Sequence, residues 1–523
     1  MGGGDYSEAA PLMPHRSIER IARASAFAER RYWPLAAAVL GLALFNLTFR
    51  LGSEFVTEWD ESLYAISAWE TLTNGTWIGT TFLGQIDYYN SKPPLMVWMI
   101  ALSFKLFGPS LVSLRIVSAV CAWLTIAALQ TWTRRQFGAL TALVTGAVLA
   151  TTFGFIHVHS GRSAATDAPF TLVLVLTVIV LWAQRTQPAW RVCLGPLLAA
   201  VFLLRGLAVF MPMAVIIVAA IVLRPMPRPR IHAAIGVALL LLPVGSWAIA
   251  RYQFDGWQFF SPLVMYDFVA RAVRPLEDHP GGPLFYLNVL QQDHFDWLFA
   301  ATVAWLALPR RREVLRAVVD AGRNRTGPAA LLLIWAAIAL IVPTAMQTKV
   351  AWYLNTFYPV FAVGVAVLVV RGLAVAASRR QLVAVIGAFA VALIAAESRL
   401  VWYSFQHRDL GISGQSLLLA ERENLQGSRV LLEPGFRAAH FVAKAVVGAA
   451  SVRHVERADL PTTVEDGDYV LATAPHETPK LTLLRSNGRR FLYRRDPEAP
   501  VPTAGDRPER RSRTGRSNTG QLP

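Results

Sequence analysis

Two adjacent acids, Asp60 and Glu61, follow the first apolar run of the chain, in the segment EFVTEWDESLYAISAWE. The small and aromatic residues after them, including Tyr64, predict a helix that lies along a membrane interface. Partial loss of water around a carboxylate in such a setting raises its pKa towards neutrality, as a general base requires. Ordinary solvated loop acids would look the same in sequence, so the pair alone leaves both interpretations open.

A lysine followed by two prolines comes next, in DYYNSKPPLMVWMIALSFKLFG. Lys92 places one point charge on a restricted backbone beside an apolar helix start, and such a charge suits a lipid phosphate at headgroup level. Tyr88 in the same segment is a candidate contact for donor or acceptor. The alternative is a loop lysine that extends along a helix start, since proline is common at the first helical position.

A third acid, Asp167, stands in HSGRSAATDAPF at the entrance of an apolar run, with Arg162 shortly before it as a further candidate contact. Asp167 could simply cap the helix that follows. The number of membrane crossings between them, however, places Asp60, Lys92 and Asp167 on the same membrane face. Two acids and a lysine on one face indicate a catalytic site more strongly than any one of them.

Further candidates for this face are a cation inside an apolar hairpin and residues at helix ends. Arg205 interrupts LLRGLAVF, and a charge at the centre of a membrane helix costs at least ~2.5 kcal/mol, so it is usually functional. Lys349 and Tyr353 lie in QTKVAWYLNTFYP, and His279 lies in a long loop. We expect Arg205 and Lys349 to bind the donor phosphate, and Tyr353 and His279 to contact donor or acceptor.

Metal chemistry is not indicated by any local motif. There is no HExxH motif and no pair of histidines at ligand spacing, so the sequence predicts no metal site and no certain cofactor, while leaving a divalent metal open. Cys121 and Cys193 both lie in apolar runs and have neither disulfide nor metal-ligand spacing.

The composition indicates that the elements positioning these residues are membrane-embedded. Apolar residues make up 54% of the chain and charged residues 16%, whereas soluble domains carry about a quarter of charged residues. The 16 tryptophans are typical of aromatic belts at two membrane interfaces. The net charge of +16 could suggest nucleic acid, but the arginines cluster between apolar runs, as orientation signals do. We therefore expect a lipid bilayer, and no nucleic acid, as partner.

The apolar runs predict an all-α polytopic membrane protein with about eleven transmembrane helices plus interfacial helices. Pro94–Phe107 is too short to cross the ~30 Å hydrocarbon core. Treating it as an interfacial or re-entrant helix puts the N-terminus and nearly every basic cluster in the cytoplasm and the C-terminal region outside. The predicted spans are Trp33–Arg50, Leu111–Thr133, Phe137–His157, Phe170–Ala183, Val192–Leu204, Leu207–Leu223, Ile231–Ala250, Val289–Leu308, Ala329–Met346, Trp352–Val370 and Leu382–Leu400.

The composition changes after residue 403. The pattern predicts a small α/β domain with strands and one helix at Val430–Leu432, Arg437–Val447, Tyr469–Thr473 and Leu481–Tyr493, the last with an Asn487-Gly488 hairpin turn. The predicted organisation is a cytoplasmic basic tail (1–31), a transmembrane domain (32–403), an extracytoplasmic α/β domain (404–496) and a disordered Arg-rich tail (497–523).

The ordered set of motifs resembles the GT-C class of glycosyltransferases, in the group of bacterial aminoarabinose transferases of lipid A and relatives of protein O-mannosyltransferases. The resemblance covers roughly residues 33–403. It rests on Asp60-Glu61 with Tyr64, KPPLMVWMIALSFKLFG, TDAPF, LLRGLAVF and QTKVAWYLNTFYP, in the family's order. It implies that Asp60 and Asp167 are acids of the catalytic cavity, that Lys92 contacts the lipid phosphate and that Tyr64 lies beside it.

Two positions depart from the aminoarabinose transferases. Those enzymes have a glutamate immediately before the lysine, which resembles a metal ligand together with a later histidine. Here Ser91 stands at that position, and His279 matches the histidine, so the resemblance does not carry a zinc site. Arg205 stands where relatives often have lysine, which keeps the charge and changes its geometry.

The expected function is that of a hexosyl or pentosyl transferase of the inverting GT-C type in the bacterial cytoplasmic membrane. It would move a sugar from a polyprenyl-phosphate donor to an envelope acceptor on the outer face, such as lipid A or another glycolipid, a polysaccharide or a protein. The alternative is a multi-pass transporter or flippase of lipid-linked sugars. The lack of internal repeats and the long first outer loop disfavour that alternative.

Overall fold

The computed structural model describes residues 15–223, 230–308, 316, 319–320, 322–376, 378–406, 413–476 and 480–496. The chain divides into two compact units whose segments alternate along the sequence. Unit 1 comprises residues 1–49, 91–93 and 118–403, and unit 2 comprises residues 50–90, 94–117 and 404–523. The predicted tail 497–523, and residues 1–14 of the predicted N-terminal tail, lie outside the described residues.

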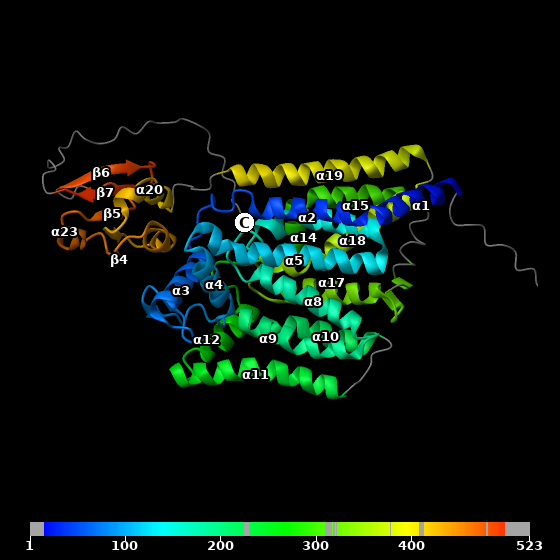
Figure 1. Ribbon diagram of the computed structural model, residues 1–523, viewed down its shortest axis with the longest axis horizontal. Helices are drawn as coiled ribbons and strands as arrows, with labels where there is room; N and C mark the ends of the chain where they lie inside the picture. The colour runs from blue at the N-terminus through cyan, green and yellow to red at the C-terminus, as the bar shows by residue number, and fades with distance from the viewer. Residues whose placement is uncertain are drawn as a thin grey trace, which may run out of the picture. The chain divides into compact units, whose positions relative to one another are not determined.

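Unit 1 is built from helices that run side by side (Figure 1). Helix α9 packs against α8 and α11, α6 packs against α2 and α18, and α10 packs against α17. In chain order the elements are α1 (His15–Arg30), α2 (Tyr32–Thr48), α5 (Leu111–Phe137, in unit 1 from Ser118), α6 (Ala139–Ala150), α7 (Phe153–His157), α8 (Asp167–Ala183), η1 (Pro188–Cys193), α9 (Leu194–Arg205), η2 (Gly206–Val209), α10 (Phe210–Val222), α11 (Arg230–Asp255), α12 (Phe260–Val264), η3 (Met265–Ala270), α13 (Arg271–Val273), α14 (Phe285–Asp293), α15 (Phe295–Ala307), α17 (Pro328–Ala345), η4 (Ala351–Thr356), α18 (Tyr358–Val375) and α19 (Arg379–Phe405).

The apolar runs of the sequence form these helices, as predicted. Among the described residues, five helical segments are long and apolar enough to cross a membrane: Leu111–Phe137, Pro188–Val222, Arg230–Asp255, Pro328–Ala345 and Arg379–Phe405. Six more apolar helices have 10–17 residues, α4 (Leu95–Phe107) among them. Helix α4 has 13 residues and is therefore about 20 Å long, less than the ~30 Å hydrocarbon core. The structure confirms a mainly helical membrane protein, while eleven crossings stay a prediction.

Unit 2 combines the segment between α2 and α5 with the C-terminal part of the chain. Its elements are α3 (Asp60–Asn74), β1 (Thr81–Phe82), β2 (Gln85–Ile86), α4, the first turns of α5, α20 (Gln415–Ala420), α21 (Arg422–Leu425), β3 (Arg429–Leu432), α22 (Arg437–Phe441), η5 (Val442–Val447), β4 (Ser451–His454), α23 (Leu460–Thr463), β5 (Tyr469–Ala472), β6 (Leu481–Ser486) and β7 (Phe491–Arg495). Helix α22 packs against α3, and the rings of Phe104 on α4 and Phe441 on α22 stack 5.6 Å apart.

The C-terminal strands form one sheet in the order β4-β3-β5-β7-β6. Strand β3 pairs in parallel with β4 and β5, and β7 is antiparallel to both β5 and β6. Leu431, Val470, Phe491 and Tyr493 belong to its buried apolar core. Strands occur where the sequence predicts them, including the β6–β7 hairpin. Strand β4 was not predicted, because its sequence SVRH contains a single apolar residue.

Candidate functional site

The predicted acids of the first loop lie at the start of α3 in unit 2. Asp60 is the first residue of the helix and is partly exposed, and a helix N-terminus favours a carboxylate. Glu61 and Tyr64 are buried, with exposed fractions of 2% and 1%. Tyr88 is partly exposed. Of these candidates, Asp60 combines a carboxylate with access to solvent.

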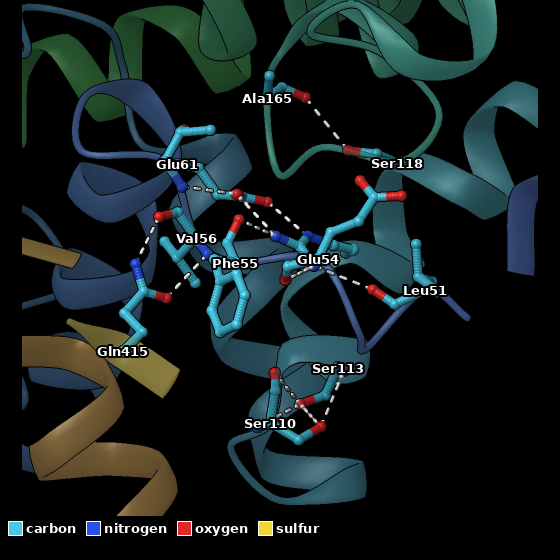
Figure 2. A network of polar contacts seen from close by, with 12 residues as sticks. Leu51, Glu54, Phe55, Val56, Glu61, Ser110, Ser113, Ser118, Ala165 and Gln415 are labelled. Atoms are coloured by element: carbon cyan, nitrogen blue, oxygen red, sulfur yellow. Dashed lines mark hydrogen bonds and ion pairs between the residues drawn. The ribbon is translucent and has the colours of Figure 1, made fainter. Parts of the chain in front are cut away.

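Glu61 is bound by an arginine that the sequence analysis did not single out. Arg115 of α5 donates through Nε to Glu61 Oε1 at 2.7 Å and through Nη2 to Oε2 at 2.9 Å. Its guanidinium also donates to the carbonyl oxygens of Leu51, Glu54 and Phe55 (Figure 2). One buried cation therefore binds three residues of the loop before α3. The signal that could have found it is a lone arginine inside an apolar run.

The second predicted acid forms an ion pair in unit 1. Asp167 begins α8, and its Oδ1 accepts from Nη1 of Arg205 at 2.5 Å. The side chains are 5% and 15% exposed, respectively. The Arg205 guanidinium lies 5.6 Å from the Phe170 ring centre and 5.5 Å from that of Tyr353. The structure thus brings together Asp167, Arg205 and Tyr353, three residues predicted from different motifs.

The backbone around Lys92 is held on both sides within unit 1. Ser91 donates from Oγ to Asp267 Oδ2 at 2.8 Å, which ties it to η3. On the other side, Pro93 Cδ would lie 3.6 Å from a Cβ atom added at Gly206, the residue after Arg205. Gly206 ends α9 with φ of 55°, a backbone conformation that favours glycine. The Lys92 backbone is therefore fixed next to the turn that carries Arg205.

Asp267 belongs to a cluster of charged and polar side chains that also contains Arg271, Glu277 and Tyr266. Arg271 donates to Asp267 Oδ1 at 3.1 Å and to Glu277 Oε1 at 2.9 Å, and Tyr266 donates to Glu277 Oε1 at 3.0 Å. Burial lowers the pKa of Arg271, but the facing Tyr353, Asp267 and Glu277 outweigh it, so the pKa lies above its ordinary value. The i,i+4 spacing of Asp267 and Arg271 is the sequence signal for this pair.

Lys349 has a structural contact in this fold. Its Nζ donates to the carbonyl oxygens of Pro343, Thr344 and Met346, at the C-terminal end of α17. Its backbone N–H donates to the carbonyl oxygen of His279 at 3.0 Å. Three donors on the ammonium group meet three carbonyls, so in this arrangement Lys349 caps a helix.

The two remaining candidates also lie in unit 1. The His279 ring is 6.0 Å from the ring of Trp352, which in turn stacks on His159 at 4.0 Å. Arg162 is 1% exposed and donates from Nη1 to the carbonyl oxygens of Asn46 and Phe49, at the end of α2. Burial of Arg162 is thus explained by helix capping.

Ser91, at the position where the resemblance implies a glutamate, offers a hydroxyl and no carboxylate to a metal. Ser91 uses its hydroxyl on Asp267, and both carboxylate oxygens of Asp267 already accept hydrogen bonds. Across the described part of the chain, no group of three or more His, Cys, Asp or Glu side chains could hold a metal ion.

Comparison with known proteins gives a consistent result. Residues 91–247 match the family described as dolichyl-phosphate-mannose-protein mannosyltransferase. The undecaprenyl phosphate-alpha-4-amino-4-deoxy-L-arabinose arabinosyl transferase 1 of Pseudomonas fluorescens is 28% identical over 277 residues, which are 51% of this chain and 49% of that protein. The chain thus spans about half the length of this relative.

Two solved structures have a similar fold. One is the crystal structure of ArnT from Cupriavidus metallidurans bound to undecaprenyl phosphate. The similarity covers 88% of this chain and 97% of that chain, with a TM-score of 0.66 and 16% sequence identity. The archaeal oligosaccharyltransferase AglB from Archaeoglobus fulgidus covers 81% and is covered to 64%, with a TM-score of 0.53 and 15% identity. These comparisons confirm the predicted resemblance of this membrane protein to the polyprenyl-phosphate-sugar-dependent glycosyltransferases of the GT-C class.

Proposed function

We propose that the protein is a membrane glycosyltransferase that moves a sugar from a polyprenyl-phosphate donor to an envelope acceptor. An acceptor hydroxyl oxygen forms a bond to the anomeric carbon as the bond from that carbon to the phosphate oxygen breaks. The bonding electrons leave with the polyprenyl phosphate, and the hydroxyl proton goes to a carboxylate base. Displacement in a single step inverts the anomeric configuration.

In this proposal Asp60 is the base, because it is the partly exposed acid at the start of α3. Lys92 and Arg205 stabilise the negative charge that develops on the leaving phosphate. Asp167 orients Arg205 through their ion pair. Glu61 and Lys349 support the site through buried hydrogen bonds. Tyr64 stays a predicted contact of the donor phosphate, and Tyr88, Arg162, His279 and Tyr353 stay predicted contacts of donor or acceptor.

The observation that carries the proposal is the arrangement of cations in unit 1. Ser91 and Pro93 fix the backbone of Lys92 beside the turn that follows Arg205, whose guanidinium is held by Asp167. Two cations on a backbone held by these contacts suit a phosphate, whose negative charge increases as the bond to the sugar breaks. The similarity to an arabinosyl transferase acting with undecaprenyl phosphate supports the same ligand class. An envelope glycolipid, polysaccharide or protein is the proposed acceptor.

The proposal includes a topology. The chain is proposed to cross a bacterial cytoplasmic membrane about eleven times, with its N-terminus in the cytoplasm and its C-terminal α/β domain outside. The placement of the basic clusters supports this orientation. The proposed boundaries are 1–31, 32–403, 404–496 and 497–523. Cysteine labelling of single-cysteine variants from outside sealed cells tests each assigned side.

The test of function uses the detergent-solubilised full-length chain. Radiolabelled undecaprenyl-phosphate 4-amino-4-deoxy-L-arabinose and undecaprenyl-phosphate mannose are each incubated with solubilised bacterial envelope as acceptor. We expect label to move from one donor to envelope material, and we expect Lys92→Ala and Asp60→Asn each to slow this transfer at least ~10²-fold at normal protein levels. A flippase needs sealed membranes, so label that moves only across intact vesicles, and never to an acceptor in detergent, would contradict a transferase.

A further inference from the structure

Three of the four residues before Asp60, namely Val56, Glu58 and Trp59, contact the C-terminal part of the chain within unit 2. Gln415 is fully buried, and its side chain forms two hydrogen bonds with one backbone unit. Its Oε1 accepts from the Val56 N–H at 3.0 Å, and its Nε2 donates to the Val56 carbonyl oxygen at 2.8 Å (Figure 2). A side-chain amide that satisfies both backbone groups of a residue fixes that residue as a strand partner would.

A second contact lies two residues further on. The Glu58 carboxylate accepts through Oε2 from the backbone N–H of Ala438 at 3.0 Å, at the start of α22. The Arg437 guanidinium lies 5.2 Å from the ring centre of Trp59, the residue that directly precedes α3. Burial raises the pKa of Glu58, and the N–H groups of α22 and the charge of Arg437 act in the opposite direction.

The same short segment is fixed from its other side. The Thr57 N–H donates to Glu61 Oε2 at 3.1 Å, and Arg115 holds that glutamate. Residues 56–59 are therefore tied at each position to groups of unit 2, although Thr57 and Trp59 are themselves exposed. A loop leading into a helix is ordinarily mobile, so this number of contacts on four residues needs an explanation beyond the stability of the loop.

We infer that Gln415 and Glu58 are positioning residues for Asp60. Through Val56 and the start of α22, they fix where α3 begins and thereby the direction of its first carboxylate. This inference rests on the proposed function, in which Asp60 removes the acceptor proton. A base must lie within hydrogen-bond reach of that proton, and a displacement of about 1 Å can cost ~10²-fold in rate. The C-terminal part of the chain then helps to orient the proposed base within unit 2.

The variants that test this inference remove one contact at a time. Gln415→Met keeps the side-chain volume and loses both hydrogen bonds to Val56. Glu58→Ala removes the acceptor for α22, whereas Glu58→Gln keeps an acceptor oxygen without the charge. Glu421→Ala is the matched control, since Glu421 pairs with Arg485 and Asn424 in the same C-terminal part.

Initial rates are measured in detergent with the radiolabelled undecaprenyl-phosphate sugars and the solubilised envelope. We expect Gln415→Met and Glu58→Ala to lower the apparent kcat about tenfold or more, with the donor KM changed less than twofold. Glu58→Gln should keep at least half of the rate, and Glu421→Ala should match the wild type. The amount of folded protein and the melting temperature of each variant are measured in parallel, and rates are expressed per folded protein, because a loss of folded protein would also lower the apparent kcat at an unchanged KM.

The decisive comparison is made in the Asp60→Asn background. If Gln415 and Glu58 act through Asp60, Gln415→Met and Glu58→Ala cause no further loss of the residual rate there. Losses that multiply with that of Asp60→Asn, or single variants with the wild-type kcat, would overturn the inference and leave the proposed function standing. Full transfer by the Asp60→Asn variant would overturn both the assignment of Asp60 as the base and the inference. This outcome is visible in the Asp60→Asn variant alone, so it is distinguishable from a failure of the inference only.

Discussion

Glu61 and Arg115 form a buried, bidentate ion pair across 54 residues of sequence, with both side chains 2% exposed. The remaining donors of Arg115 satisfy three carbonyl oxygens of the loop before α3. Taking both charges out of water is costly, so the pair contributes less to stability than its geometry suggests. Its importance appears when one partner is lost, because the other charge then remains buried without compensation.

Arg115→Ala should therefore destabilise the protein by ~3–5 kcal/mol, the usual cost of breaking a buried pair. The matched control is Arg134→Ala, which removes a partly exposed pair with Glu29, in which Arg134 is 29% and Glu29 48% exposed, together with the contact of Arg134 with the Tyr32 ring. An exposed pair contributes at most about 1 kcal/mol. Thermal unfolding in detergent measures both variants, and equal shifts in Tm would contradict the assignment of Arg115 as a buried structural cation.

The apolar pattern predicted the helices because helical membrane segments are defined by length and hydropathy, both of which are local. The same reasoning predicted that α4 differs from its neighbours, since its 13 residues are too few to cross. The number of crossings was not settled, because six apolar helices fall below the length that identifies a span. Tilt and packing decide those cases, and a local pattern contains neither.

Side-chain pairing was predicted less well than residue type. Lys349 was expected beside a phosphate because it is a cation at a helix end, yet its Nζ caps the carbonyls of α17. Asp167 and Arg205 were each predicted, but their pairing across 38 residues was not. Gln415 carried no signal, since nothing local marks a glutamine whose partner is Val56, 359 residues away.

The Asp167–Arg205 pair predicts how the donor site responds to substitution. Asp167→Ala leaves Arg205 without its carboxylate beside Phe170 and Tyr353. We expect transfer to fall at least ~10²-fold, because the guanidinium then lacks the ion pair that orients it towards the phosphate. Arg205→Lys keeps the charge but loses the planar fork, so part of the rate should remain. Initial rates with radiolabelled undecaprenyl-phosphate sugars measure both, and Arg205→Lys no more active than Arg205→Ala would contradict a role for the charge.

Gly206→Ala tests the turn that adjoins Lys92. The new Cβ would lie 2.6 Å from Leu263 Cδ1, on a backbone with φ of 55°. We expect a loss of ~1–3 kcal/mol of stability and weaker binding of undecaprenyl phosphate, since the turn contacts Pro93. In Gly245→Ala the added Cβ meets nothing within 4 Å inside α11, so that variant should keep both properties. Tm and the affinity for undecaprenyl phosphate are measured for both variants. Equal Tm values and equal affinities would contradict a strained turn at Gly206.

Two stacked histidines in unit 2 predict a pH-dependent stability of that unit. His440 Nδ1 lies 3.2 Å from His454 Nε2, and the rings are nearly parallel. Burial, followed by the charges of His454 and Lys444, lowers the pKa of His440 to about 4. Burial and the charge of Arg437 also lower the pKa of His454. Both folded-state values lie below the ordinary value near 6.5, so the folded state favours the neutral rings.

The stabilising contribution of these histidines is therefore fully present above pH ~6.5 and is lost as the pH falls towards 4. One pKa unit corresponds to ~1.4 kcal/mol, so His440 alone accounts for up to ~3 kcal/mol. Tm measured in detergent at pH 7.5, 5.5 and 4.5 should fall more steeply for the wild type than for the His440→Gln, His454→Gln double variant. If Tm depends on pH equally in both proteins, protonation of the pair does not destabilise the folded state. The buried, neutral state assigned to the two rings would then be wrong.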